Sequence, residues 1–461
     1  MKMKVMLALL ASLGLALAQA QTAPVSWIQS GAKTGYQVQG TGDPTTAQGA
    51  KASVTSSSAQ SDMSGVVMAV SDAAPYRGKM VSLQADLSTR NADKGVTIFL
   101  AMYGPNGSLG FISSDRVPVL GDVTSAQRQI QIGVPSAATR LSYGVVLHGN
   151  GTVDAEHIRL IAAAPIVEVP PQLVLDKAIT IVREYAFNTS KVDWATVEPQ
   201  IRAMAANAKV SQDVYPAIRA LLADLDDHHS YFQEPSLAEL LSTQGGPQSP
   251  SVVELKPNGV GYISMPGYNG KDPQARESFA DDMVQAITKL APQVRCGWVV
   301  DLRSNTGGSM APMLAGLGPL LGGDTLGSFR DAQGRLTAWQ VGYGMKGNVP
   351  KGPDLSHASV AVLTGEHTAS SGEVMAISLR GRANTRSFGA PTAGLTTSSV
   401  DFPLPDGSMI ILATSIDLDR NGHVYGEKIA PDQPVDASDS KTDAVLNAAE
   451  AWLFQTNHCA H

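Results

Sequence analysis

The sequence predicts a multidomain chain in which an all-β sandwich precedes an α/β domain with a helical cap. Two observations predict this order. Residues 21–164 hold short segments in which apolar and polar residues alternate, the period of half-buried strands. From residue 173 the spacing becomes helical, and after residue 251 strand-like and helix-like segments alternate, which is typical of an α/β domain. In such a domain we expect functional loops at the carboxyl ends of the strands.

The first 20 residues have the pattern of a secretory signal peptide. A basic start, MKMK, precedes an apolar run over residues 5–18, and Ala18-Gln19-Ala20 offers small residues for cleavage. The run is too short for a confident membrane span, and no later stretch resembles one. We therefore expect an exported protein, periplasmic or secreted, with no transmembrane segment after cleavage.

Composition limits the partners. The net charge is −7 and no run of Lys and Arg occurs, which argues against a nucleic-acid-binding protein. The only cysteines are Cys296 and Cys459. Export permits a disulfide between them, but the sequence leaves two independent thiols equally open.

The β module, residues 21–164, is expected to contain eight to ten strands. Alternating segments at residues 80–85, 95–102, 128–132 and 140–147 are separated by Gly-rich and Asn-rich turn signals. The segments at residues 74–85 and 151–161 resemble jelly-roll modules of the carbohydrate-binding type. Carbohydrate binding stays open beside a sandwich without that function, because fold alone does not define function. Trp27 is the only Trp of this module, which gives sugar stacking little support.

A Pro-rich linker, residues 165–172, leads to the predicted helical cap, residues 173–250. Apolar spacing predicts helices starting at Leu173, over residues 194–206 and over residues 211–225. The last of these ends in the polar sequence Asp227-His228-His229-Ser230.

The α/β core is predicted for residues 251–461. Strands are expected at residues 260–263, 297–301 and 360–363, and helices at 277–290, 310–321 and 374–379. Two further β-like segments lie near Phe329 and Trp339. The second strand ends in a loop that contains Gly307 and Gly308.

The stretch at residues 360–379 is the most informative in the chain. An apolar strand is followed by Thr368-Ala-Ser-Ser-Gly-Glu373 and then by a helix, a context that often presents a nucleophilic hydroxyl. A Ser at a helix start also has free backbone N–H groups beside it, which can receive an oxyanion. The alternative is an ordinary capping box with Glu373.

Two other loops supply the groups that a Ser nucleophile needs. His is the usual general base near neutral pH, and the Asp227–Ser230 loop holds two. A Gly pair allows backbone amides to approach a substrate carbonyl, and Gly307-Gly308 is such a pair. We therefore expect the three loops to meet.

Five motifs in order carry a family resemblance. They are Asp227-His-His-Ser230, Asp301-Leu-Arg-x-Asn-x-Gly-Gly308, Thr368-x-Ser-Ser-Gly-Glu373, Gly389-x-Pro-Thr-x-Gly394 and Pro431-Asp432. Together they resemble the C-terminal-processing (tail-specific) serine peptidases and their tricorn relatives, over about residues 173–435. The resemblance implies a crotonase-like α/β core. It also implies Ser370 as nucleophile, His229 as general base, and an oxyanion hole from the N–H of Ser371 and of Gly307 or Gly308.

The chain departs from that family in three places. Members with a Ser–Lys dyad carry a Lys where this chain has Leu395, so the Lys is absent. Members with a tetrad have a Glu seven residues before the Asp of Pro-Asp. Here that position is Tyr425, and the nearest carboxylate is Glu427, which becomes the candidate orienting acid. The segment between Phe232 and Val253 is too short for the PDZ domain of many members.

The sequence thus favours an exported serine endopeptidase that cuts peptides or unfolded proteins through an acyl-enzyme, with no cofactor and no metal. A catalytically silent ligand-binding or envelope-binding protein on the same fold is the alternative. His228 and His367 are weaker candidates for the base, and Glu373 is expected to cap its helix.

Overall fold

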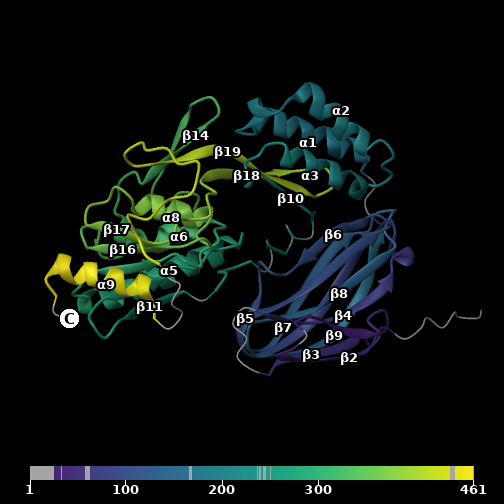
Figure 1. Ribbon diagram of the computed structural model, residues 1–461, viewed down its shortest axis with the longest axis horizontal. Coiled ribbons are helices and arrows are strands. Elements are labelled where there is room, and N and C mark those ends of the chain that lie inside the picture. The colour runs from purple at the N-terminus through teal and green to yellow at the C-terminus, as the bar shows by residue number, and fades with distance from the viewer. Residues whose placement is uncertain are drawn as a thin grey trace, which may run out of the picture.

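The computed structural model describes residues 25–32, 34–57, 63–165, 169–235, 237, 240–241, 245–249, 251–436 and 442–459. The predicted signal peptide, residues 1–20, lies outside these ranges, as do residues 166–168 of the predicted linker. Figure 1 shows a β module beneath a group of helices, with a mixed α/β region beside both. Within the described part of the chain, no helix is both long enough and apolar enough to span a bilayer.

Nine strands form the N-terminal β module. They are β1 (Trp27–Gly31), β2 (Tyr36–Gly42), β3 (Ala50–Ser56), β4 (Ser64–Asp72), β5 (Lys79–Gly104), β6 (Gly107–Ser113), β7 (Val119–Gly133), β8 (Arg140–His148) and β9 (Thr152–Pro165). The long strand β5 belongs to two layers, because its first half pairs with β7 and β9 and its second half with β6 and β8. Irregular register between Leu87 and Val96 marks the change of layer.

The core of this module follows from the alternation in the sequence. On β5, Val81, Leu83, Leu87, Ile98 and Leu100 are fully buried, and within each half of the strand the buried apolar residues alternate with residues such as Gln84 and Asp86 that are less buried. The sequence treated this stretch as two separate strands, whereas the structure has one continuous strand. Bulges explain the difference, because they bend a strand without ending it.

The cap consists of α1 (Pro171–Tyr185), α2 (Trp194–Met204) and α3 (Tyr215–Ala223), with short 3₁₀ turns between them. Helix α1 begins at Pro171, two residues before the predicted start, because proline is well suited to the first helical position. The apolar faces of these helices pack against Leu404, Ile410 and Leu412 of the α/β region. The cap is therefore seated on the core domain (Figure 1).

The core contains a six-stranded sheet. Its strands, in spatial order, are β11 (Val252–Leu255), β12 (Gly261–Ser264), β13 (Trp298–Asp301), β16 (Val360–Thr364), β17 (Thr385–Gly389) and β20 (Gln433–Pro434). All neighbours are parallel except β11 and β12. The sheet therefore presents the carboxyl ends of β13 and β16 on one edge.

Helices cover both faces of this sheet. One face packs against α5 (Pro273–Leu290), α6 (Met310–Gly316), α7 (Gly318–Leu321) and α8 (Ser371–Leu379), and the other against α9 (Ala444–Asn457). The single helix predicted for residues 310–321 is wrong in detail, because it breaks at Leu317 into α6 and α7. Pro319 lacks the backbone N–H that would continue α6.

A second sheet connects the cap to the core. Its strands are β10 (Tyr231–Gln233), β14 (Gly327–Asp331), β15 (Leu336–Trp339), β18 (Thr397–Pro403) and β19 (Met409–Asp419). Strand β19 pairs with β10, β14 and β18. It therefore connects residues that follow the His pair with residues that follow the Ser370 helix.

A disulfide joins Cys296, just before β13, to Cys459, just after α9, with a Cα–Cα distance of 6.0 Å. Of the two alternatives left open by the sequence, the structure contains the bonded one. The bond attaches the C-terminal helix to the sheet on the face away from α8.

Candidate active site

Ser370 lies at a sharp turn between β16 and α8. Its backbone has φ +53° and ψ −121°, a conformation that is unfavourable for a residue with a side chain. Such strain persists only where the surroundings hold it, and it is concentrated at functional sites. The turn places the Ser370 hydroxyl at the carboxyl edge of the sheet and at the amino end of a helix.

Glu373 holds this turn in place. Its Oε2 accepts hydrogen bonds from the N–H groups of Ser370 and Leu395, both at 2.8 Å. Its Oε1 accepts from the N–H of Gly394, at 2.9 Å, and from the hydroxyl of Thr392. Burial raises the pKa of Glu373, and these hydrogen bonds act against that rise. The capping expected from the sequence is present, and the same carboxylate also fixes the loop after β17.

The structure brings His229 to Ser370. The Nε2 atom of His229 lies 2.9 Å from the Ser370 Oγ, and its Nδ1 lies 2.7 Å from the Thr397 Oγ1. If Nδ1 donates to Thr397, Nε2 is left unprotonated and faces the hydroxyl, as a general base requires. Burial lowers the pKa of His229, so the neutral form is favoured at neutral pH.

Asp227 supports the His loop through the backbone. Its Oδ1 accepts from the N–H of His229 at 3.0 Å and of Ser230 at 2.7 Å. Its Oδ2 accepts from the Ser230 hydroxyl, which in turn accepts from the N–H of Ala413 on β19. The structure gives Asp227 a hydrogen bond to the His229 backbone, and its charge only opposes the lowering of the His229 pKa.

The glycine pair lies against the nucleophile turn. Gly307 and Gly308 have φ +93° and +106°, and a Cβ on Gly308 would stand 2.2 Å from the Tyr268 carbonyl oxygen. The N–H of Gly307 donates to the Asn305 Oδ1 at 2.9 Å. Among the described residues, the N–H groups of Gly308 and Ser371 have no hydrogen-bond acceptor. Of the two glycines that the sequence left open, Gly308 therefore has the available donor.

Two residues of the site carried no signal of their own in the sequence. Thr397, whose hydroxyl contacts the Nδ1 of His229, is the first residue of β18 and looks in the sequence like any single Thr at the start of a strand. Asn305 is fully buried; its carbonyl accepts from the N–H of Ala369 at 3.0 Å, and its side chain holds Gly307. Only the family motif, in which the Asn is one position, could have suggested Asn305.

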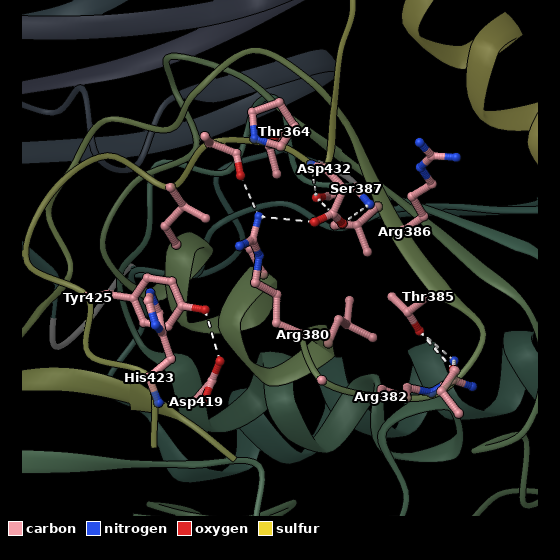
Figure 2. Close-up of a pocket in the computed structure, with 18 of the residues that line it drawn as sticks. Thr364, Arg380, Arg382, Thr385, Arg386, Ser387, Asp419, His423, Tyr425 and Asp432 are labelled. Carbon is pink, nitrogen blue, oxygen red and sulfur yellow. Dashed lines mark hydrogen bonds and ion pairs between the residues drawn. The ribbon is translucent and has the colours of Figure 1, made fainter. Parts of the chain in front are cut away.

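Glu427 does not come to His229. It is exposed, and its backbone carbonyl accepts from the Thr396 hydroxyl at 3.1 Å. The Pro431-Asp432 motif lines a separate pocket of about 750 Å³, whose lining includes neither Ser370 nor His229. Figure 2 shows Arg380 reaching across that pocket towards Asp432. Thr397 thus occupies the position at His229 that the sequence assigned to a carboxylate.

Neither of the other two candidate histidines is hydrogen-bonded to Ser370 within the described part of the chain, although His228 lines the same pocket as Ser370 and His229. The side chains of His228 and His367 are 85% and 73% exposed, and their nearest charged partners are Asp226 and Glu366. Among the described residues, no group of three or more His, Cys, Asp or Glu is arranged to hold a metal ion.

Among the pockets formed by the described residues, two are lined by Ser370. The larger, about 690 Å³, is lined by residues of the cap, the core and the β module, including His229 and Gly308. The smaller, about 280 Å³, includes Met310, Phe329, Tyr343 and Val374 and is largely apolar. Both touch Ser370, so an extended chain could lie across the hydroxyl with side chains in either pocket.

Residues 259–435 match peptidase family S41, which confirms the family drawn from the motifs. Over 283 residues the chain is 25% identical to the nisin-resistance protein of Lactococcus lactis subsp. lactis, covering 60% of this chain and 86% of that protein.

Two solved structures extend the comparison. A lipoprotein from Streptococcus agalactiae matches with a TM-score of 0.54 at 23% identity, over 64% of this chain and 99% of that chain. A photosystem II D1 C-terminal processing protease matches with a TM-score of 0.43 at 17% identity, over 61% and 98%. The likeness to the lipoprotein shows a shared fold over the matched part of the chain.

Proposed function

From the peptidase family S41 domain that this chain carries at residues 259–435, we infer that the protein is a serine endopeptidase acting on peptides or unfolded proteins. The observation that carries the proposal is the 2.9 Å approach of His229 Nε2 to the Oγ of Ser370, at a strained strand-to-helix turn. A base in contact with a hydroxyl at such a turn is the arrangement of an activated nucleophile.

The proposed reaction has two halves. The Ser370 Oγ attacks the peptide carbonyl carbon while its proton passes to His229 Nε2, and the oxyanion is received by the N–H groups of Gly308 and Ser371. Collapse of the intermediate breaks the C–N bond, and His229 returns the proton to the leaving amine. Water, deprotonated by His229, then attacks the acyl-enzyme, and the acid product leaves with Ser370 restored.

Thr397 and Glu373 are assigned positioning roles. Thr397 fixes the ring of His229 through Nδ1, although a hydroxyl stabilises an imidazolium less than a carboxylate does. Glu373 keeps the strained turn closed. The proposal includes export, a crotonase-like arrangement of the core, a jelly-roll-like β module, and a division into β module, cap and core near residues 164 and 250.

A silent binding protein on the same fold is the second candidate. It is favoured by one observation: among the residues that the structure describes, no carboxylate contacts the imidazole of His229, the candidate acid Glu427 being exposed. Binding without hydrolysis would use the same pockets around Ser370.

Labelling with a fluorophosphonate probe separates the two candidates, because the probe reacts with an activated Ser. We expect wild type to be labelled on Ser370, identified by peptide mass spectrometry, and Ser370→Ala to be unlabelled with an unchanged Tm. Wild type should hydrolyse casein, and nisin is a second substrate to test because a relative is named for resistance to it. Absence of both labelling and hydrolysis, with peptide binding retained, would establish the silent binder.

A further inference from the structure

One wall of the larger pocket comes from outside the peptidase domain. The loop between β6 and β7, residues 114–118, contributes Asp115 and Arg116 to the same pocket as Ser370 and His229. This loop belongs to the N-terminal β module, whereas the family match begins at residue 259. The β module thus reaches the site that the peptidase domain supplies.

The loop is held from both sides. The Asn269 Nδ2 donates to the Arg116 carbonyl oxygen at 2.9 Å, and Arg116 Nη1 donates to the Tyr231 hydroxyl at 2.9 Å. The Arg116 guanidinium lies over the Tyr231 ring, 5.0 Å from its centroid. On the other side, Val117 is buried in the module's own core. The position of Arg116 in the cleft is therefore fixed by both domains.

The module is also packed against the cap and the segment that follows it. Leu240 and Leu241, which follow β10, are buried in the β module's hydrophobic core. A Cβ on Gly133 of β7 would stand 2.3 Å from the Gln212 side chain, which shows how closely the surfaces meet. Such packing argues for a fixed module and against one tethered only by its linker.

The charges of the cleft do not all cancel. Lys271 and Asp401 pair with each other at 2.7 Å. The Asp115 carboxylate faces His148 of its own module, at 3.8 Å. Arg116 and Arg276 remain, and within the described ranges neither forms an ion pair; Arg276 donates through Nε to the Gly270 carbonyl at 2.9 Å.

We propose that the β module completes the substrate cleft and that Arg116, with Arg276, binds a carboxylate of the peptide substrate. The inference rests on the proposed peptidase function and names the substrate chemistry of that site. A guanidinium offers several N–H donors in a plane that matches a carboxylate, and a pocket wall restricts where that carboxylate can lie. The carboxylate belongs either to an acidic side chain or to the chain terminus.

Peptide binding to the Ser370→Ala protein tests this without turnover. We would use fluorescent peptides that differ only in one residue, Glu, Gln or Lys, walked along the sequence, each with a free or an amidated C-terminus. Fluorescence anisotropy should show the Glu peptide bound about fivefold more tightly than the Gln peptide at one position, the scale of an exposed ion pair. If amidation of the C-terminus weakens binding and replacement of Glu by Gln does not, the carboxylate is the chain terminus.

Charge reversal distinguishes recognition from support of the fold. Adding Arg116→Ala should abolish the preference for a carboxylate, and Arg116→Glu should reverse it in favour of Lys. The matched control is Arg140→Ala, which removes a guanidinium stacked on Tyr103 in the same module and away from the pocket. It should leave the preference intact.

The outcomes separate this inference from the proposed function. Equal binding of the Glu, Gln, Lys and amidated peptides, no binding of any, or a carboxylate preference that survives Arg116→Glu would overturn the inference. If wild type hydrolyses peptides but its carboxylate preference does not depend on Arg116, the peptidase function stands and the role of Arg116 is refuted. A preference that Arg116→Glu reverses, with no hydrolysis by wild type, would support the inference and remove the peptidase.

Discussion

The Nε2 of His229 and the Oγ of Ser370 lie 2.9 Å apart although 141 residues separate them in the chain. Strand β19 is what brings them together. It pairs with β10, which starts two residues after His229, and with β18, which starts at Thr397, the Nδ1 partner. The cap residue and the core residue therefore meet through one strand that belongs to neither loop.

Gly308→Ala is predicted to disable the site through the backbone. The residue has φ +106°, and a Cβ would stand 2.2 Å from the Tyr268 carbonyl oxygen, so the loop must move. Moving the Gly308 N–H removes one proposed oxyanion donor, and we expect kcat to fall about 100-fold. Steady-state kinetics on a peptide cleaved by wild type measures this.

Gly334→Ala is the control for that variant. Gly334, between β14 and β15, also has positive φ, at +81°, but a Cβ there would meet nothing within 4 Å. We expect a loss of about 1 kcal/mol of stability and an unchanged kcat. If both variants lose kcat equally, backbone strain and not the oxyanion donor explains the effect.

Asp417→Asn is predicted to stabilise the protein at neutral pH. Asp417 is fully buried beside Glu373, and neither of its carboxyl oxygens has a hydrogen-bond partner among the described residues. Burial raises its pKa well above the ordinary value, with the nearby Glu373 charge adding to the rise. The folded state then holds a proton that the unfolded chain releases, so stability falls as pH rises above about 4.

An Asn at position 417 has nearly the same size as Asp and cannot ionise. The free energy of unfolding of Asp417→Asn should therefore exceed that of wild type by about 1–3 kcal/mol at pH 7, and this gain should vanish near pH 4. Thermal unfolding across pH measures it. Asp419→Asn, on the same strand, should instead destabilise, because Asp419 accepts hydrogen bonds from Asn421, His423 and Tyr425. Equal destabilisation by both substitutions would contradict the argument.

Removing the disulfide is predicted to lower stability and leave the chemistry intact. Cys296 and Cys459 are separated by 163 residues, and closing so long a loop contributes up to about 5 kcal/mol in the chain-entropy account. The bond lies on the face of the sheet opposite α8. The variant in which both cysteines are replaced by Ser should have a lower Tm than wild type and a normal kcat at 25 °C. A reductant should lower the Tm of wild type and leave the Tm of this variant unchanged. A wild-type Tm that ignores reductant would refute this.

Local sequence could predict some parts of the site and not others. The turn at Ser370 was recognisable because strand, small residues and helix are adjacent in the chain. The meeting of the His loop with this turn was expected from the groups that a Ser nucleophile needs, but the choice of His229 over His228 came only from the family motifs. Thr397 could not be found, since its role depends on the register of β18 against β19, which no local pattern encodes.

Motif spacing along the chain did not identify the side chain that contacts His229, because that contact depends on the three-dimensional arrangement of the loops. The search for an orienting acid led to Glu427, yet that side chain is exposed and the motif around Asp432 lines another pocket. The β-rich N-terminal region was predicted from alternation. Its contribution to the cleft was not, because a single Arg in a loop between two strands gives no sign of what the loop will face.

The identity of the base can be decided with three single variants. We expect His229→Ala to lower kcat by about a thousandfold or more, and His228→Ala and His367→Ala, whose side chains are largely exposed, to keep near-normal turnover. Since burial lowers the pKa of His229, the neutral imidazole persists to lower pH than in an exposed His. Activity should therefore rise with pH through a midpoint below the ordinary value of about 6.5 and then level off.

The partner of Nδ1 gives the same experiment a second readout. Thr397→Val keeps the shape and removes the hydrogen bond to His229, so kcat should fall about tenfold while KM changes little. Thr397→Ser, which keeps the hydroxyl, should retain most activity. Retained turnover in the His229 variant with loss in another would transfer the role to that residue. Retained turnover in all three His→Ala variants would exclude these histidines as the base. The sequence has no Lys at the Leu395 position to take the role instead.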